Sequence, residues 1–153
     1  YLYDFFSELY GIPTDRRDAR KRMLFARFGI QEFAQVRVRD LSTGMKQKVS
    51  LVISLVQEPE IIIFDEPTNG LDILTAKVVT DFLLDLKEQG KTIIISTHIF
   101  SLVEKICDRV GIIINGRMAA CEDLRTLCGD KSLEDRFFEI YEAVNGEEEN
   151  HDK

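Results

Sequence analysis

Length, composition and charge restrict this chain to a few classes of protein. Its 153 residues are 44% hydrophobic and 31% charged, which suits one globular domain with an ordinary core. The net charge of −7 argues against a general nucleic-acid-binding protein, because such proteins neutralise phosphates with a clustered basic surface.

The first third of the chain is predicted to be helical. The opening sequence YLYDFFSELYG has the amphipathic pattern of a helix already under way, and we expect further chain before it. A second helix begins after Pro13, with Thr14 as its N-cap, and ends at Gly29. The basic run from Arg16 to Arg27 is interpreted as a solvated helix face.

A third helix is predicted to begin at Ser42, whose hydroxyl can cap it, and to run toward Pro59. Its apolar residues recur at helical spacing on two faces, which predicts deep burial: Val49, Leu51, Val52, Ile53, Leu55 and Val56.

Short apolar runs follow beyond Pro59 and predict strands. Residues Ile61–Phe64, Ile93–Ile95 and Val110–Ile114 are rich in β-branched side chains, as expected for strands covered on both faces of a parallel sheet. An amphipathic segment that ends at Gly90 separates the first two and predicts a helical crossover. The dipeptide Asn115-Gly116 predicts a tight hairpin, from which Met118 to Cys121 returns antiparallel.

Two adjacent carboxylates, Asp65 and Glu66, end the first predicted strand. The carboxyl edge of a parallel sheet is where α/β proteins bind ligands. Side-by-side carboxylates resist desolvation unless a cation or a proton lies between them. The pair therefore indicates a metal site or a catalytic proton transfer, with a solvated turn as the alternative for this motif alone.

Three motifs in order carry a resemblance to ABC ATPases. DLSTGMKQK, IIIFDEPTNGLD and the STH that ends the next strand resemble the signature sequence, the Walker B segment with its D-loop, and the H-loop of that family. The resemblance covers nearly all of the chain. It implies an α/β fold of the P-loop NTPase type, present in part, with a mainly parallel sheet, an N-terminal helical subdomain and a C-terminal hairpin.

The resemblance also implies roles for individual residues. Asp65 resembles the aspartate that holds Mg²⁺, and Glu66 resembles the residue that polarises the attacking water. His98 resembles the histidine that contacts the γ-phosphate of ATP, and Leu71 and Asp72 resemble the D-loop that crosses to the opposite subunit.

Ser42, Thr43 and Gly44 match signature positions that contact the γ-phosphate of ATP held by a partner subunit. A hydroxyl and backbone N–H groups at a helix start form an anion site, and glycine permits close approach. The pentapeptide is LSTGM where the common form is LSGGQ, which affects any contact from the fifth side chain and leaves the N–H groups in place. The STGMKQK variant and the C-terminal sequences resemble exporter-type subunits.

The implied organisation has three parts: a helical signature subdomain at residues 1–57, the C-terminal part of the ATPase core at 58–130, and a C-terminal helix with an acidic tail at 131–153. No G-x-x-x-x-G-K-[ST] loop occurs, so we expect a fragment that is inactive alone and that self-associates through an uncovered sheet edge.

The resemblance implies ATP and Mg²⁺ as cofactors, with a transmembrane permease and a second ATPase subunit, identical or not, as partners. Nucleic-acid binding is not expected because of the net negative charge. Membrane insertion is not expected because no apolar run approaches the roughly 20 residues of a spanning helix. Three cysteines without C-x-x-C spacing fit a reducing compartment, the cytosol, and the resemblance implies a place on the cytoplasmic face of the cell membrane. Two alternatives remain open: a soluble ABC ATPase acting on ribosomes, and a chromosome- or repair-associated ATPase head.

Overall fold

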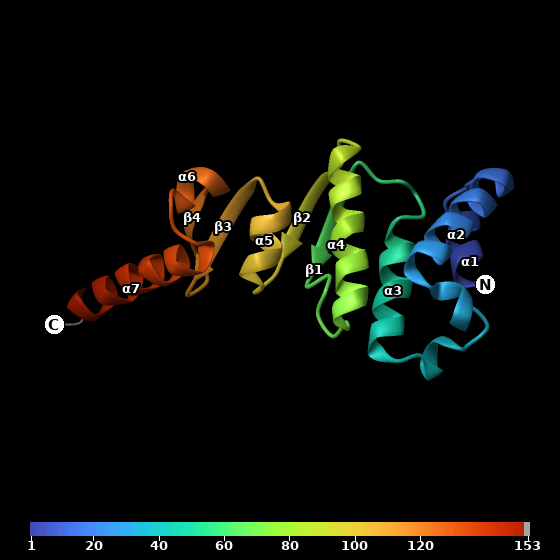
Figure 1. Ribbon diagram of the computed structural model, residues 1–153, viewed down its shortest axis with the longest axis horizontal. Helices are drawn as coiled ribbons and strands as arrows, with labels where there is room; N and C mark the ends of the chain where they lie inside the picture. The colour runs from blue at the N-terminus through green and yellow to red at the C-terminus, as the bar shows by residue number, and fades with distance from the viewer. Residues whose placement is uncertain (152–153) are drawn as a thin grey trace. The chain divides into compact units, whose positions relative to one another are not determined.

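The computed structural model describes residues 1–151, and the side chains of residues 1–146 (Figure 1). The residues form two compact units, Tyr1–Thr97 and His98–Lys153, called here the first and second unit. The three-part organisation expected from the sequence stays a prediction. Its acidic tail lies outside the residues whose side chains are described.

The first unit begins with helices, as predicted. Its helical elements before the first strand are α1 (Leu2–Leu9), α2 (Thr14–Phe28), the 3₁₀ turns η1 (Ile30–Phe33) and η2 (Val38–Asp40), and α3 (Thr43–Ser54). Helix α2 ends at Gly29 in the left-handed conformation, as expected for a C-cap glycine. Its N-cap is Pro13, whereas Thr14 is already helical, so the predicted N-cap is wrong by one residue.

The α3 prediction is confirmed. Ser42 is the N-cap, and Leu51, Val52, Leu55 and Val56 are buried at the C-terminal end of the helix. Val49 and Ile53, which were also predicted to be deeply buried, are only half-buried, and the exposed residues Lys46, Ser50 and Ser54 form a polar stripe at helical spacing.

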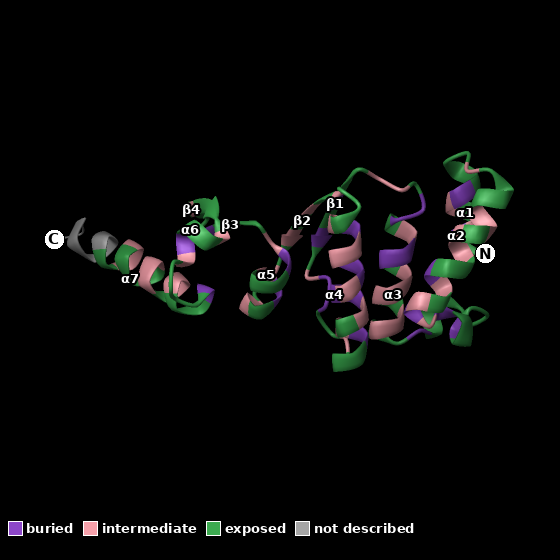
Figure 2. Ribbon diagram, turned by 45° about the horizontal axis from the view of Figure 1, so that its top comes forward, coloured by how far each residue is buried: buried purple, intermediate pink, exposed green. Residues whose placement is uncertain are grey.

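A parallel strand pair completes the first unit. Strand β1 (Ile61–Asp65) leads into helix α4 (Ile73–Glu88), and the chain returns as β2 (Thr92–Ser96), which pairs with β1 residue for residue. Figure 2 shows the buried residues of α4 along one side of the helix. The predicted crossover and its parallel pairing are confirmed.

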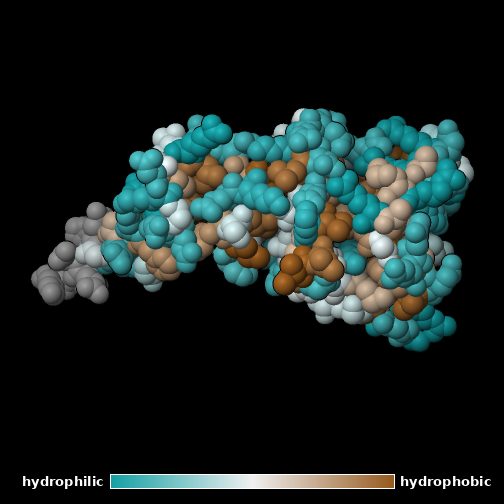
Figure 3. Space-filling view, viewed as in Figure 1, coloured by the Kyte–Doolittle hydropathy of each residue, from teal (hydrophilic) through white to brown (hydrophobic). Residues whose placement is uncertain are grey.

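The expectation that these strands are covered on both faces is wrong. Ile62 and Phe64 of β1 are buried, whereas Ile61 and Ile63 are 62% and 73% exposed. Ile94 of β2 is also exposed. Successive side chains of a strand point to opposite faces, and within the first unit only one face of the pair is packed. Figure 3 shows hydrophobic residues at the surface in the region of α4, whose first turn carries the exposed Ile73 and Leu74.

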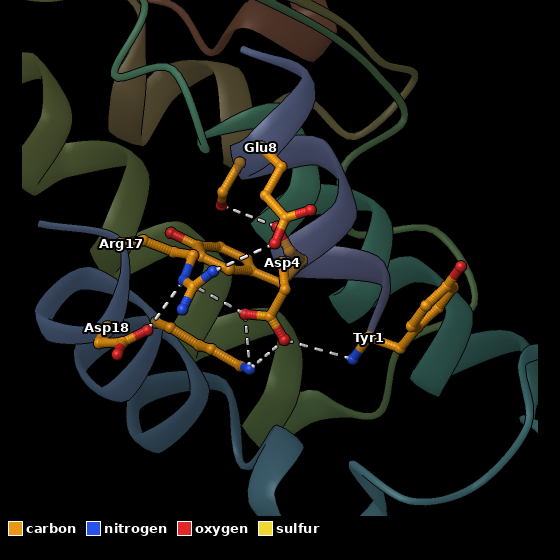
Figure 4. A network of polar contacts seen from close by, with 8 residues as sticks. Tyr1, Asp4, Glu8, Arg17 and Asp18 are labelled. Carbon is orange, nitrogen blue, oxygen red and sulfur yellow. Dashed lines mark hydrogen bonds and ion pairs between the residues drawn. The ribbon is translucent and has the colours of Figure 1, made fainter. Parts of the chain in front are cut away.

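The basic run of α2 is paired with acidic groups and is not simply solvated. Lys21 Nζ lies 2.7 and 2.8 Å from the two carboxylate oxygens of Asp4, and Arg17 contacts Asp4, Glu8 and Asp18 (Figure 4). The Lys21 ammonium opposes the effect of burial and lowers the pKa of Asp4. The pairs that involve Asp4 and Glu8 join α1 to α2, because these acidic residues of α1 face basic residues of α2.

The second unit contains a β-hairpin between helices. Its elements are α5 (Phe100–Ile106), β3 (Arg109–Ile114), β4 (Arg117–Asp123), α6 (Leu124–Cys128) and α7 (Leu133–His151). Asn115 and Gly116 both have positive φ, as a two-residue hairpin turn requires. The predicted hairpin is confirmed, but β3 pairs antiparallel with β4 and has no parallel partner among the described strands.

Four buried residues form the core of the second unit: Ile112, Ile114, Leu127 and Leu133. Helix α7 packs on this core, and the Leu133 N–H at its start donates to the Glu104 carboxylate at 2.7 Å. Helices α5 and α7 therefore make a polar contact in addition to the apolar contact between the rings of Phe100 and Phe137.

Candidate nucleotide site

The two adjacent carboxylates lie where β1 ends. Asp65 is the last residue of β1 and is in register with Ser96, the last residue of β2. The Glu66 N–H donates to the Ser96 carbonyl at 2.8 Å, which extends the parallel pairing one residue past the strand. The backbone of this carboxylate pair is therefore fixed by β2.

Hydroxyl groups from the end of β2 contact both carboxylates. Ser96 Oγ donates to Asp65 Oδ1, and Thr97 Oγ1 donates to Glu66 Oε2 at 3.0 Å. The sequence reasoning assigned no role to either hydroxyl. Aligning the ends of the two predicted strands would have placed Ser96 and Thr97 beside the carboxylates.

Glu66 has φ of 46°, in the left-handed region that few residues other than glycine adopt. Pro67 follows and is fully buried, and the Asn69 N–H donates back to the Glu66 carbonyl at 3.1 Å. A non-glycine residue in this region costs on the order of 1–3 kcal/mol and persists where its surroundings hold it. The turn changes the chain direction sharply between the strand and the segment that leads to α4.

The start of α3 is the second part of the candidate site. Ser42 Oγ accepts from the Met45 N–H at 3.2 Å, and the Ser42 carbonyl accepts from the Lys46 N–H at 2.9 Å. An α-helix start presents backbone N–H groups and a partial positive charge, which favour an anion. The predicted N-cap geometry of Ser42 is thus confirmed, whereas phosphate contact by Ser42, Thr43 and Gly44 stays a prediction.

The start of α3 lies against the segment between β1 and α4. A methyl group placed on Gly44 would be 3.6 Å from Leu71 Cδ2 and 3.7 Å from the Gly70 carbonyl oxygen. One on Gly70, whose φ is 71°, would be 3.6 Å from Thr43 Cγ2. The structure therefore brings together two segments that the sequence reasoning assigned separately to nucleotide binding.

Asp72 caps α4. The Thr75 N–H donates to Asp72 Oδ1 at 3.0 Å and the Thr75 hydroxyl donates to Oδ2 at 2.7 Å. These donors, the hydroxyl foremost, lower the pKa of the Asp72 carboxyl. Asp72 consequently has a structural role in this chain, beside its predicted role at a subunit interface.

His98 belongs to a different compact unit from the other predicted site residues. It is the first residue of the second unit, whereas Ser42, Asp65, Glu66 and Asp72 belong to the first. Its contact with the γ-phosphate, and its place at the same sheet edge as Asp65, stay predictions.

The donor atoms at the end of β1 suit a magnesium ion that is shared with a substrate. Among the described residues, no three or more histidine, cysteine, aspartate or glutamate side chains are grouped so as to hold a metal. Mg²⁺ is commonly bound by one or two carboxylates together with substrate phosphates, and Asp65 and Glu66 supply oxygen ligands of that kind.

No helix within residues 1–151 is long and apolar enough to cross a membrane.

Comparison with known proteins gives a consistent result. A family model described as ABC transporter matches residues 4–69. The ABC transporter ATP-binding protein NatA of Bacillus subtilis is 38% identical over 131 residues, which are 86% of this chain and 53% of that protein. The fluoroquinolones export ATP-binding protein of Mycobacterium tuberculosis is 36% identical over 118 residues, which are 77% of this chain and 38% of that protein. The chain thus spans about half the length of these relatives or less.

Solved structures agree with these matches. The ATP-binding subunit of an ABC transporter matches with a TM-score of 0.84 and 29% identity, over 91% of this chain and 60% of that one. A dimeric ATP-binding cassette in a post-hydrolysis state, bound to ADP and Pi, has a TM-score of 0.65 and 26% identity, over 75% of this chain and 50% of that one. The predicted fold is confirmed, and the chain belongs to the ABC transporter ATP-binding protein family.

Proposed function

We propose that this chain forms part of an ATP-hydrolysing subunit that drives export through an ABC transporter. The observation that carries the proposal is the pair Asp65 and Glu66 at the end of β1, each side chain tied to the end of β2. Adjacent carboxyl groups, held in place at a strand end, suit a bound cation and a base for water.

Each carboxylate has its own role in this proposal. Asp65 would hold Mg²⁺, which when bound neutralises charge between the β- and γ-phosphates of ATP. Glu66 accepts or orients the proton of the attacking water. His98 contacts the γ-phosphate.

The start of α3 acts on the ATP of a second subunit. The Ser42 hydroxyl and the N–H groups of Thr43 and Gly44 bind the γ-phosphate held by the partner, and Leu71 and Asp72 cross the same interface. Support comes from the proximity of Gly44 to Leu71, since two segments that face one partner should share a surface. The dimeric relative bound to ADP and Pi also supports this arrangement.

Export is proposed from the relatives. One is named for the export of fluoroquinolones, and this chain resembles it over 77% of its own length. The partners are a transmembrane permease and a second ATPase subunit, identical or different. The proposed place is the cytoplasmic face of the cell membrane.

The test uses a subunit that joins these 153 residues to a P-loop segment, called here the P-loop-containing subunit. Glu66→Gln should preserve ATP binding and lower the hydrolysis rate by about 10²–10⁴-fold, the usual contribution of a positioned base. Glu60→Gln, at the residue directly before β1, is the matched control and should leave both unchanged. Equal turnover in Glu66→Gln and wild type would contradict the proposal.

The 153-residue chain alone should neither bind Mg-ATP tightly nor hydrolyse it. It contains no G-x-x-x-x-G-K-[ST] loop, whose backbone and lysine make most phosphate contacts in P-loop enzymes. Its exposed Ile61, Ile63 and Ile94 should instead promote self-association that does not depend on nucleotide. Calorimetric titration and light scattering test both statements, and micromolar affinity or a dimer that forms only with ATP would contradict them.

A further inference from the structure

Thr97 makes a contact that the proposed roles do not use. Its hydroxyl donates to Glu66 Oε2 at 3.0 Å, from a residue directly after β2. Thr97 itself is partly buried. The contact joins residues 31 positions apart in the chain.

We infer that Thr97 is a positioning residue for Glu66, holding the carboxylate in the orientation from which it acts on water. The inference rests on the proposed function, because it gives Glu66 the role of base. Thr97 acts through Glu66 and touches neither ATP nor water in this account.

The backbone geometry restricts the positions of both groups in this hydrogen bond. The Glu66 N–H to Ser96 carbonyl bond, 2.8 Å long, fixes the main chain of Glu66 one residue from Thr97. Glu66 also has a positive φ, so its side chain leaves the strand in a direction that the turn sets. Threonine is β-branched and has few χ1 rotamers, which limits where its hydroxyl can lie. Both ends of the hydrogen bond are thereby restricted.

A glutamate without such a contact would sample several rotamers. Each bond of its side chain adds conformations, and ordering them costs free energy at the moment of reaction. A carboxylate held beforehand avoids that cost, which is the advantage of a positioned catalytic group. The neighbouring contact, from Ser96 Oγ to Asp65 Oδ1, gives the other carboxylate a separate donor. The two acidic side chains therefore do not compete for one hydroxyl.

The test compares three variants of the P-loop-containing subunit. Thr97→Val keeps the shape of the side chain and removes the donor, and should lower kcat about 10-fold, the expected effect of losing a hydrogen bond to a charged group. KM, the Kd for ATP and the melting temperature should stay at wild-type values. Thr97→Ser restores a hydroxyl and should recover most of kcat. Thr92→Val makes the same change at the other end of β2 and should have no effect on kcat.

A double variant separates positioning from other roles. In a Glu66→Ala background, Thr97→Val should cause no further loss of kcat, since the group that it positions is absent. An additional 10-fold loss there, unchanged kcat in Thr97→Val, or a loss confined to ATP affinity or thermal stability would each overturn the inference. If Glu66→Gln slows hydrolysis while Thr97→Val does not, the proposed function stands and the inference fails. If neither slows hydrolysis, both fail.

Discussion

The two parts of the candidate site are built in different ways. The carboxylate pair, Asp65 and Glu66, is held by side chains of another strand, through contacts between residues 31 positions apart. The start of α3 is held locally, because Ser42 caps its own helix three residues away. A local motif is complete once its own segment folds, whereas the carboxylate pair needs the register of β1 with β2.

This difference predicts different sensitivity to sequence. The geometry of the carboxylate pair depends on the side chains at four positions: Asp65, Glu66, Ser96 and Thr97. The start of α3 offers mainly backbone N–H groups, so Thr43 and Met45 can replace the glycine and glutamine of the common signature and leave those groups in place.

The largest expected effect is on the core of the first unit, to which both parts belong. Leu83 of α4 is fully buried in the first unit, and Leu83→Ala should lower the free energy of unfolding by about 2–5 kcal/mol. Urea unfolding of the P-loop-containing subunit measures this loss. Because both parts belong to this unit, ATP hydrolysis and ATP-dependent dimerisation should fall in the same proportion as the folded fraction.

Leu74→Ala is the matched control for this prediction. Leu74 lies on the first turn of the same helix and is 77% exposed, so the same change of side chain should alter stability by less than about 0.5 kcal/mol. A Leu83→Ala variant as stable as wild type would show that α4 does not support the two parts.

The sequence predicted the local features of this molecule well. Ser42 as N-cap, Gly29 as C-cap and the Asn115-Gly116 turn each depend on a few neighbouring residues, and the structure has all three. The signals were short-range rules of backbone conformation, which hold in most contexts.

The features that the sequence did not predict depend on what packs against them. The apolar residues of β1 and β3 correctly indicated strands, but the prediction that both faces would be covered was wrong, because Ile63 and Ile113 are exposed. The hydroxyls of Ser96 and Thr97 gained their roles from strand register. The carboxylates themselves could be predicted, because two adjacent acidic residues after an apolar run form a contiguous sequence motif that can be recognised without knowing the strand register.

A smaller effect is expected from a change that affects the start of α3 and leaves the carboxylate pair intact. Ser42→Ala removes the cap of α3 and should cost about 1 kcal/mol of stability. ATP-dependent dimerisation should weaken about 10-fold, since the hydroxyl that we propose contacts the partner's phosphate is also lost. Binding of ATP to the monomer should not change. Analytical ultracentrifugation with and without ATP measures the first effect, and calorimetry the second.

Ser50→Ala is the control, because Ser50 is exposed on the same helix. Ser42→Asn keeps a capping oxygen and should recover the stability but not the dimer. If Ser42→Ala dimerised as wild type does, the assignment of α3 to the interface would be wrong.

Glu58 lies on the connection between the two parts, after α3 and before β1. Its carboxylate accepts from Arg16 Nη2 at 2.5 Å and from Arg20 Nη1 at 2.7 Å, both on α2. Arg20 Nε also donates to the Leu55 carbonyl at 3.2 Å, at the end of α3. Helix α2 thereby holds the segment through which the start of α3 and the end of β1 are linked.

The smallest expected effect is a pH-dependent loss of this contact. The Arg16 guanidinium, aided by Arg20, lowers the pKa of Glu58 below its ordinary value of about 4.3. A carboxyl with a lowered folded pKa stabilises fully above its unfolded pKa, and this contribution disappears as pH falls through the folded value. Glu58→Gln should therefore cost about 0.5–1 kcal/mol at pH 7, within the range for partly exposed ion pairs, and less as the pH is lowered below 4. Glu88→Gln, which removes an exposed carboxylate from the end of α4, should show no such pH dependence. Urea midpoints of the three proteins at pH 7 and pH 3 measure the difference. A Glu58→Gln deficit that stayed constant across this range would mean that the side chain contributes by packing, and that charge does not link the two parts.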